Sequence, residues 1–75
     1  MPEIVIRLNN LNEIKDFVNL SNMCSGEVNV YNSKYIGNGK SLKDVMNLNI
    51  TDIIKVEIEG DIPLEVKENM KKYIV

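Results

Sequence analysis

The sequence predicts an α+β fold, an open-faced sandwich in which a four-stranded antiparallel sheet carries three helices on one face. Apolar residues recur with period two in some segments and with a spacing of three to four in others, which gives the element order βαββαβα. Each segment with the strand period has one apolar and one polar side, so the helices have to cover a single face. The connections are short, and we expect a single domain over residues 1–75.

The first strand and the first helix follow each other directly. Residues 3–8 (EIVIRL) alternate between apolar and polar positions, as in a strand with one buried side. From Leu11 the spacing lengthens to that of an amphipathic helix running to about Met23, and Ser25-Gly26 ends it. The predicted buried face of this helix consists of Leu11, Ile14, Phe17, Val18 and Ser21.

The middle of the chain predicts a hairpin and a short helix. EVNVYNSKYIG reads as two short strands folded over an Asn32-Ser33 turn. After Gly37-Asn38-Gly39, the second helix places Leu42, Val45 and Met46 at helical spacing, and Leu48 continues these apolar contacts.

The last third predicts a fourth strand and a third helix. DIIKVEIEGD alternates strictly, with Ile54, Val56 and Ile58 on one side. Gly60-Asp61 breaks the strand, and Pro63 suits the first turn of a helix because its missing N–H is not needed there. The predicted apolar face of this helix is Val66, Met70, Tyr73 and Ile74.

Composition excludes several function classes. The net charge is -2 with mixed signs, which disfavours nucleic acid as a partner, and no apolar span of about twenty residues predicts membrane insertion. The single Cys24 forms no internal disulfide, which favours the cytoplasm, and we interpret it as a packing residue. No histidine, no phosphate-binding loop of P-loop spacing and no Cys/His cluster is present, so we expect neither an enzyme nor a metal or other cofactor.

The segments FVNLSNMCSGEVNVYNSKYIGNGKSL and VEIEGD, in this element order, resemble the HPr family, the small histidine-phosphorylated carriers of the bacterial sugar phosphotransferase system. The resemblance runs from about Phe17 to Asp61. Its most specific part is Lys40-Ser41-Leu42, which resembles the family's Lys-Ser-[Ile/Leu] at the start of its second helix. The resemblance implies the HPr-like open-faced sandwich.

The carrier motif of that family, Gly-[Ile/Leu]-His-[Ala/Thr]-Arg-Pro, has no match in this chain. A degenerate loop with Asn9, Asn10 and Asn12 stands before the first helix, and the sequence contains no histidine. An asparagine carboxamide is too weak a nucleophile to accept and release a phosphoryl group. Asn10 and Glu13 instead have the spacing of a helix N-cap with an acidic partner.

Ser41 has two open interpretations. Ser41-Leu42-Lys43-Asp44 has the pattern of a capping box with Asp in place of Glu, which needs no further purpose. The resemblance to HPr proteins implies a regulatory phosphorylation site at this serine. Lys40 and Lys43 would favour a phosphate there, whereas Asp44 would oppose it.

Three hypotheses about function follow. The first is a non-catalytic regulatory or protein-interaction module that binds partners through Leu42, Val45 and Met46, with Met46 as the foremost contact. Its partners would be phosphotransferase-system components or a transcriptional regulator. The second is a phosphocarrier with a non-histidine acceptor: Asp16, Glu13 or Cys24. The third is a structural remnant without a retained phosphotransfer role.

Overall fold

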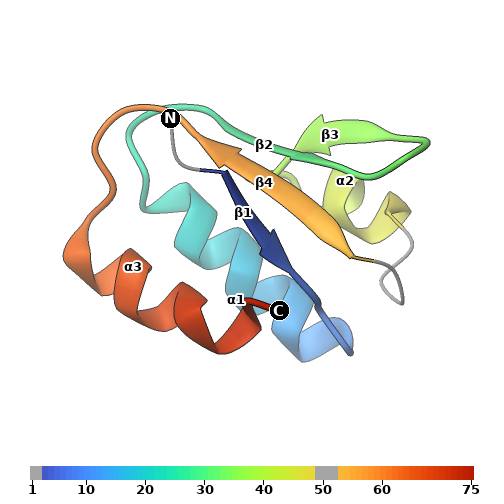
Figure 1. The fold of residues 1–75 in the computed structure, drawn as a ribbon, viewed down its shortest axis with the longest axis horizontal. Helices are drawn as coiled ribbons and strands as arrows, with labels where there is room; N and C mark the ends of the chain where they lie inside the picture. Colours follow the sequence, from blue (N-terminus) through green and yellow to red (C-terminus); the bar gives the residue numbers. More distant parts are fainter. Residues whose placement is uncertain (1–2, 49–52) are drawn as a thin grey trace.

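The computed structural model describes residues 3–48 and 53–75, and it confirms the predicted element order (Figure 1). The sheet has the strand order β1-β4-β2-β3, and each neighbouring pair is antiparallel. The elements are β1 (Glu3–Ile6), α1 (Leu11–Asn22), β2 (Val28–Tyr31), β3 (Ile36–Asn38), α2 (Leu42–Asn47), β4 (Ile54–Ile58), α3 (Leu64–Met70) and a 3-10 turn, η1 (Lys71–Tyr73).

Strand β4 lies in the middle of the sheet and sets the register of its two neighbours. Val56 stands opposite Ile4 of β1 and opposite Val30 of β2. The alternation puts Ile54, Val56 and Ile58 on the covered face, where each is at most 3% exposed. A shift of the strand register by one residue would turn all three side chains toward solvent. Their burial therefore fixes the register of β4 against its neighbours.

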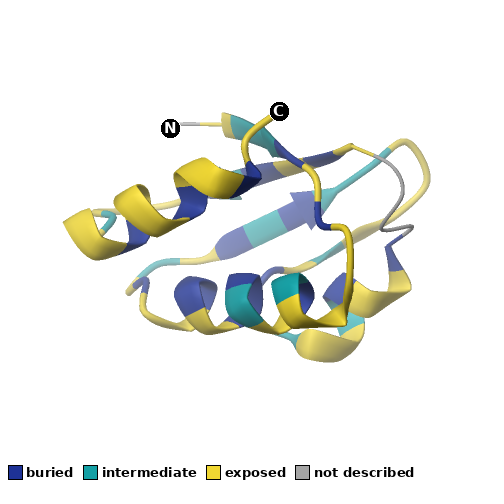
Figure 2. Ribbon diagram, turned by 90° about the horizontal axis from the view of Figure 1, so that it is seen from below, coloured by how far each residue is buried: buried dark blue, intermediate teal, exposed yellow. Residues whose placement is uncertain are grey.

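The helices cover one face of the sheet, as predicted. In Figure 1, α1 and α3 lie side by side, and α2 lies beneath the β3 end of the sheet. Figure 2 shows that each helix turns its buried side inward and its exposed side outward. Phe17 and Ser21 of α1 and Val66 of α3 are fully buried between these layers. Within the described residues, no helix has the length and hydropathy needed to span a membrane.

The prediction that Leu11 belongs to the buried face of α1 is wrong, because this side chain is 46% exposed. Leu11 is the first residue of the helix, and helical side chains tilt toward the N-terminus. Its side chain therefore points past the core rather than onto it. Pro63 is also shifted, since it is the N-cap of α3 rather than part of the first turn.

The chain after α3 differs from the predicted continuous helix. Residues 71–73 tighten into η1, and Ile74 is extended, 47% exposed and bridged to Ile6 of β1. The N–H of Arg7 donates to the carbonyl of Tyr73 at 2.9 Å, and the N–H of Val75 donates to that of Val5 at 3.0 Å. Ile74 thus leaves the helix face because the chain turns to pair with β1.

A side-chain contact ties this C-terminal segment to α1. The Tyr73 hydroxyl donates a hydrogen bond to the Asp16 carboxylate, and the Lys72 ammonium lies 3.2 Å from the same carboxylate. The hydrogen bond from Tyr73, with a smaller effect of Lys72, lowers the pKa of Asp16. Burial and the contact with Asp16 raise the pKa of Tyr73. The ionised carboxylate is therefore the form that the folded chain favours.

We expect Tyr73→Phe to lower the free energy of unfolding by about 1 kcal/mol at pH 7, because the Asp16 carboxylate loses the hydrogen bond that the Tyr73 hydroxyl donates. The lowered pKa of Asp16 contributes stability above the unfolded pKa of about 4, and this contribution disappears as pH falls through the folded value. The variant should therefore lose less stability than the parent between about pH 5 and about pH 2. Urea denaturation followed by circular dichroism measures both effects.

The matched control for this prediction is Tyr35→Phe, because Tyr35 is 39% exposed and its hydroxyl only accepts from the Asn47 amide. We expect it to leave the acid dependence unchanged. An acid dependence in Tyr73→Phe identical to that of the parent would contradict the role given to Asp16.

Candidate functional site

The loop before α1 ends in an N-cap, Asn10. The Asn10 side chain accepts from the N–H of Glu13 at 2.9 Å, which confirms the predicted N-cap. The Glu13 carboxylate accepts from the Asn9 N–H at 2.8 Å, one residue earlier than in the standard capping box. Asn12 lies exposed in the first turn. The two polar side chains thus satisfy backbone donors at the start of the helix.

The three alternative phosphoryl acceptors are already engaged. Glu13 holds the Asn9 N–H, and Asp16 holds the hydroxyl of Tyr73. Cys24 is 3% exposed, its thiol donates to the Leu20 carbonyl at 3.7 Å, and burial raises its pKa. A buried thiol that stays protonated is a poor nucleophile. The contacts of these side chains therefore favour structural roles.

The turn between β3 and α2 is held by a compact set of hydrogen bonds around Asn38. Its N–H donates to the Asp44 carboxylate at 2.9 Å, and its side-chain oxygen accepts from the Lys40 N–H at 2.9 Å. Its carbonyl accepts from the Ser41 N–H at 3.0 Å. Ser41 then caps α2, because its hydroxyl accepts from the N–H of Asp44 at 3.2 Å. This geometry confirms Ser41 as an N-cap.

The ammonium group of Lys40 binds the chain after α1. Its ammonium donates to the Cys24 carbonyl at 2.8 Å, next to the end of α1. The Asn22 amide donates to the Lys40 carbonyl at 3.0 Å, so side chain and backbone of Lys40 both bind the same region. The Lys40 ammonium is thus engaged by a carbonyl after α1, and its support for a phosphate on Ser41 stays a prediction. Lys43 is exposed and remains available.

The α2 surface is formed by Leu42 and Met46, which are 38% and 51% exposed. They lie four residues apart on the six-residue helix α2 and share one face. Val45 was predicted to belong to this surface, but it is fully buried. The helix has to turn one apolar side chain inward to cover the sheet, and Val45, followed by Leu48, takes that position.

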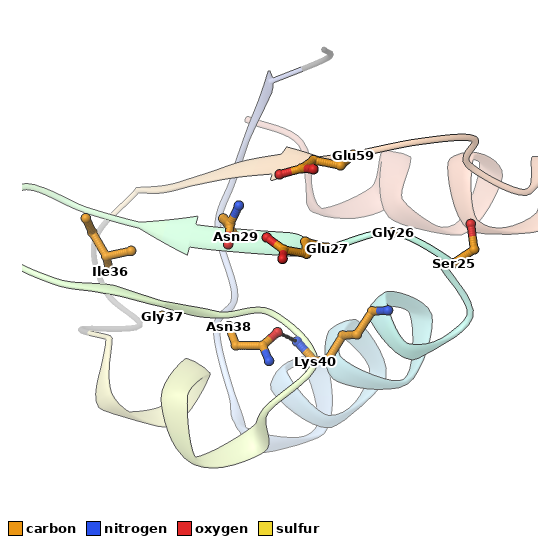
Figure 3. Close-up of a pocket in the computed structure, with 9 residues that line it drawn as sticks. All are labelled: Ser25, Gly26, Glu27, Asn29, Ile36, Gly37, Asn38, Lys40 and Glu59. Atoms are coloured by element: carbon orange, nitrogen blue, oxygen red, sulfur yellow. Dashed lines mark hydrogen bonds between the residues drawn. The ribbon is translucent and has the colours of Figure 1, made fainter.

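A shallow hollow of about 580 Å³, which the sequence did not predict, lies beside this turn (Figure 3). The carboxylates of Glu27 and Glu59 line it, together with Asn29 and Asn38. The backbones of Gly26 and Glu59 approach so closely there that a Cβ on Gly26 would lie 2.1 Å from the Glu59 carbonyl oxygen. In the sequence, Gly26 could have indicated this close backbone approach, but a glycine after a helix is also typical of a simple helix end.

This hollow does not fit an anionic ligand. Its two glutamates give it negative charge, and the ammonium of Lys40 is bonded to the Cys24 carbonyl. Among residues 3–48 and 53–75, no group of three His, Cys, Asp or Glu side chains is placed to hold a metal ion. We therefore regard the α2 surface and its Ser41 cap as the candidate functional site.

We expect Ser41→Ala to lower the free energy of unfolding by about 1 kcal/mol, because the Asp44 N–H loses its acceptor. Ser41→Asp should retain most of the stability, since aspartate is also a good N-cap. Urea denaturation checks both variants, and Ser25→Ala at an exposed position serves as the control. Equal stability of Ser41→Ala and the parent would contradict the capping role.

Comparison with solved structures supports the fold. A crystal structure of HPr-C-His from Thermoanaerobacter tengcongensis is 24% identical in sequence and superposes with a TM-score of 0.77, covering 96% of this chain and 89% of that one. No protein-family model and no curated protein matches the sequence. The chain therefore has the HPr-like fold, a four-stranded antiparallel sheet with three helices on one face.

Proposed function

We propose that this chain is an HPr-like protein of the phosphotransferase-system family that has lost the active-site histidine and acts as a non-catalytic regulatory or protein-interaction module. The observation that carries the proposal is an HPr-like fold whose first helix begins with the Asn10–Glu13 cap instead of a nucleophile. In this proposal residues 1–75 form one domain, which is not an enzyme and works in the cytoplasm. Its partners are proteins, either phosphotransferase-system components or a transcriptional regulator.

The contacts at the start of α1 support the absence of carrier function. A phosphoryl group at a helix N-terminus needs free backbone N–H donors and a positive local potential. Here the Glu13 N–H is taken by Asn10, and the Asn9 N–H is taken by the Glu13 carboxylate. A carboxylate thus occupies the place of an anionic group and would repel a second one. Neither the phosphocarrier alternative nor the remnant gains a supporting observation from these contacts.

The exposed side chains of α2 support protein binding. Leu42 and Met46 present apolar surface on a helix that is otherwise fixed by its Ser41 cap and by Val45 beneath it. Methionine adapts to different apolar partners because its side chain is unbranched and polarizable. A rigid helix with two exposed apolar side chains can supply the central contacts of a small interface.

Phosphorylation of Ser41 would regulate this surface by changing its first turn. The phosphate would add about -1.5 to -2 charges immediately before Leu42. Lys43 is exposed and could approach it, whereas Asp44 would be repelled. Because Asp44 also holds the Asn38 N–H, modification would disturb the turn that positions α2.

The carrier and regulatory parts are tested by intact mass. One sample contains phosphoenolpyruvate and the first enzyme of the system, and another contains ATP and the HPr kinase. We expect no gain of about 80 Da in the first sample and a gain in the second that Ser41→Ala abolishes. A mass gain in the first sample would establish a carrier with a non-histidine acceptor and would contradict the proposal.

The interaction part is tested with candidate partners by calorimetry. We expect Met46→Asp to weaken binding at least tenfold, which corresponds to about 1.4 kcal/mol, because a charge replaces an apolar contact. Met23→Asp is the matched control, since Met23 is 45% exposed but lies at the end of α1. Equal losses in both variants would argue against the α2 surface, and no binding by the parent chain would favour the structural remnant.

A further inference from the structure

An apolar groove of about 310 Å³ lies between α3 and the β1–β4 pair, away from the α2 surface. Lys67 of α3 and Lys71, the first residue of η1, line one side of it. They are four residues apart and Lys71 keeps a helical backbone conformation, so their stems lie on the same side. The floor is almost entirely aliphatic and consists of Ile4, Ile58, Ile62, Met70 and Ile74.

The two lysines give the rim of the groove its positive charge. Long lysine side chains can cover apolar surface with their methylene groups while the ammonium stays in water. Lys71 also lies 3.7 Å from the Glu68 carboxylate, but both side chains are more than half exposed, so this pair is weak and easily exchanged. None of the ion pairs formed by the described residues involves Lys67. The groove thus joins an apolar floor to a cationic rim.

The size and surroundings of the groove limit what can occupy it. An extended peptide cannot add to the outer edge of β1 at this place, because the segment after Tyr73 already pairs with β1. The volume lies at the lower end of the range of small-molecule pockets.

We propose that this groove binds a small amphiphilic anion, a molecule with a single aliphatic chain and a terminal carboxylate. The chain lies on the isoleucine floor, and the carboxylate lies between the ammonium groups of Lys67 and Lys71. Ile74 is a part of the floor because the chain leaves the helix after η1, so the C-terminal pairing with β1 also builds the site. The site is independent of Ser41 and of the α2 surface.

The test is a titration of the isotope-labelled full chain with monomeric sodium octanoate, followed by amide and methyl chemical shifts. We expect saturable shifts confined to the groove, with a Kd on the order of 1 mM. The double variant Lys67→Gln/Lys71→Gln should bind about fivefold more weakly, and added salt should reduce affinity in the parent. The matched control is Lys34→Gln/Lys43→Gln, which removes two exposed lysines elsewhere and should leave binding unchanged.

Octylammonium separates charge recognition from simple apolar binding. We expect it to bind at least about fivefold more weakly than octanoate, because it carries the same charge as the rim. Equal binding of the two compounds, or shifts that never saturate, would overturn the proposal. Shifts that appear on concentrating the protein alone would assign the groove to a second copy of the chain. Shifts that appear only with vesicles containing anionic lipid would assign it to a membrane surface. Either result would also overturn the proposal.

Discussion

The one-sided burial of the sheet is the constraint on which the rest of the structure depends. Strand β4 pairs with both β1 and β2, and its apolar side chains Ile54, Val56 and Ile58 face the same layer as Ile6 and Val30. The three helices have to lie on that side because the opposite side of each strand is polar or partly exposed. This single layer therefore sets which side of each helix is buried and which side is exposed.

The starts of α1 and α2 differ in the residues that cap them and in the side chains that they leave exposed. At α1 the cap formed by Asn10 and Glu13 takes up the backbone N–H groups of Glu13 and Asn9. At α2 the cap is a serine, the helix after it has six residues, and Val45 is its buried side chain. Leu42 and Met46 then remain outside. The exposed chemistry of α2 is thus apolar, whereas the start of α1 presents polar side chains that bind the backbone.

Most of the architecture could be predicted because it depends on local period. The alternation around Val56 and the helical spacing around Phe17 each indicate which side is buried. The caps at Asn10 and Ser41 were also predictable, since a cap depends on residues three positions apart. The orientation of Leu11 and the extended backbone of Ile74 could not be predicted. They depend on where the sheet ends and on the pairing with β1. The same reason applies to Lys40, whose ammonium binds a carbonyl sixteen residues away in the sequence.

The carboxylate of Asp44 also bears on the exposed edge of the sheet. It accepts from the N–H of Asn38 on β3, the strand at the far end of the sheet from β1. Ile36 of the same strand is 77% exposed, so without this contact β3 would offer both a sticky side chain and an open backbone donor to another molecule. A negative charge at that position repels an identical chain approaching in the same way. Asp44 thus covers an outward-facing backbone donor of an edge strand and places a negative charge beside it, a combination that disfavours edge-to-edge pairing of strands.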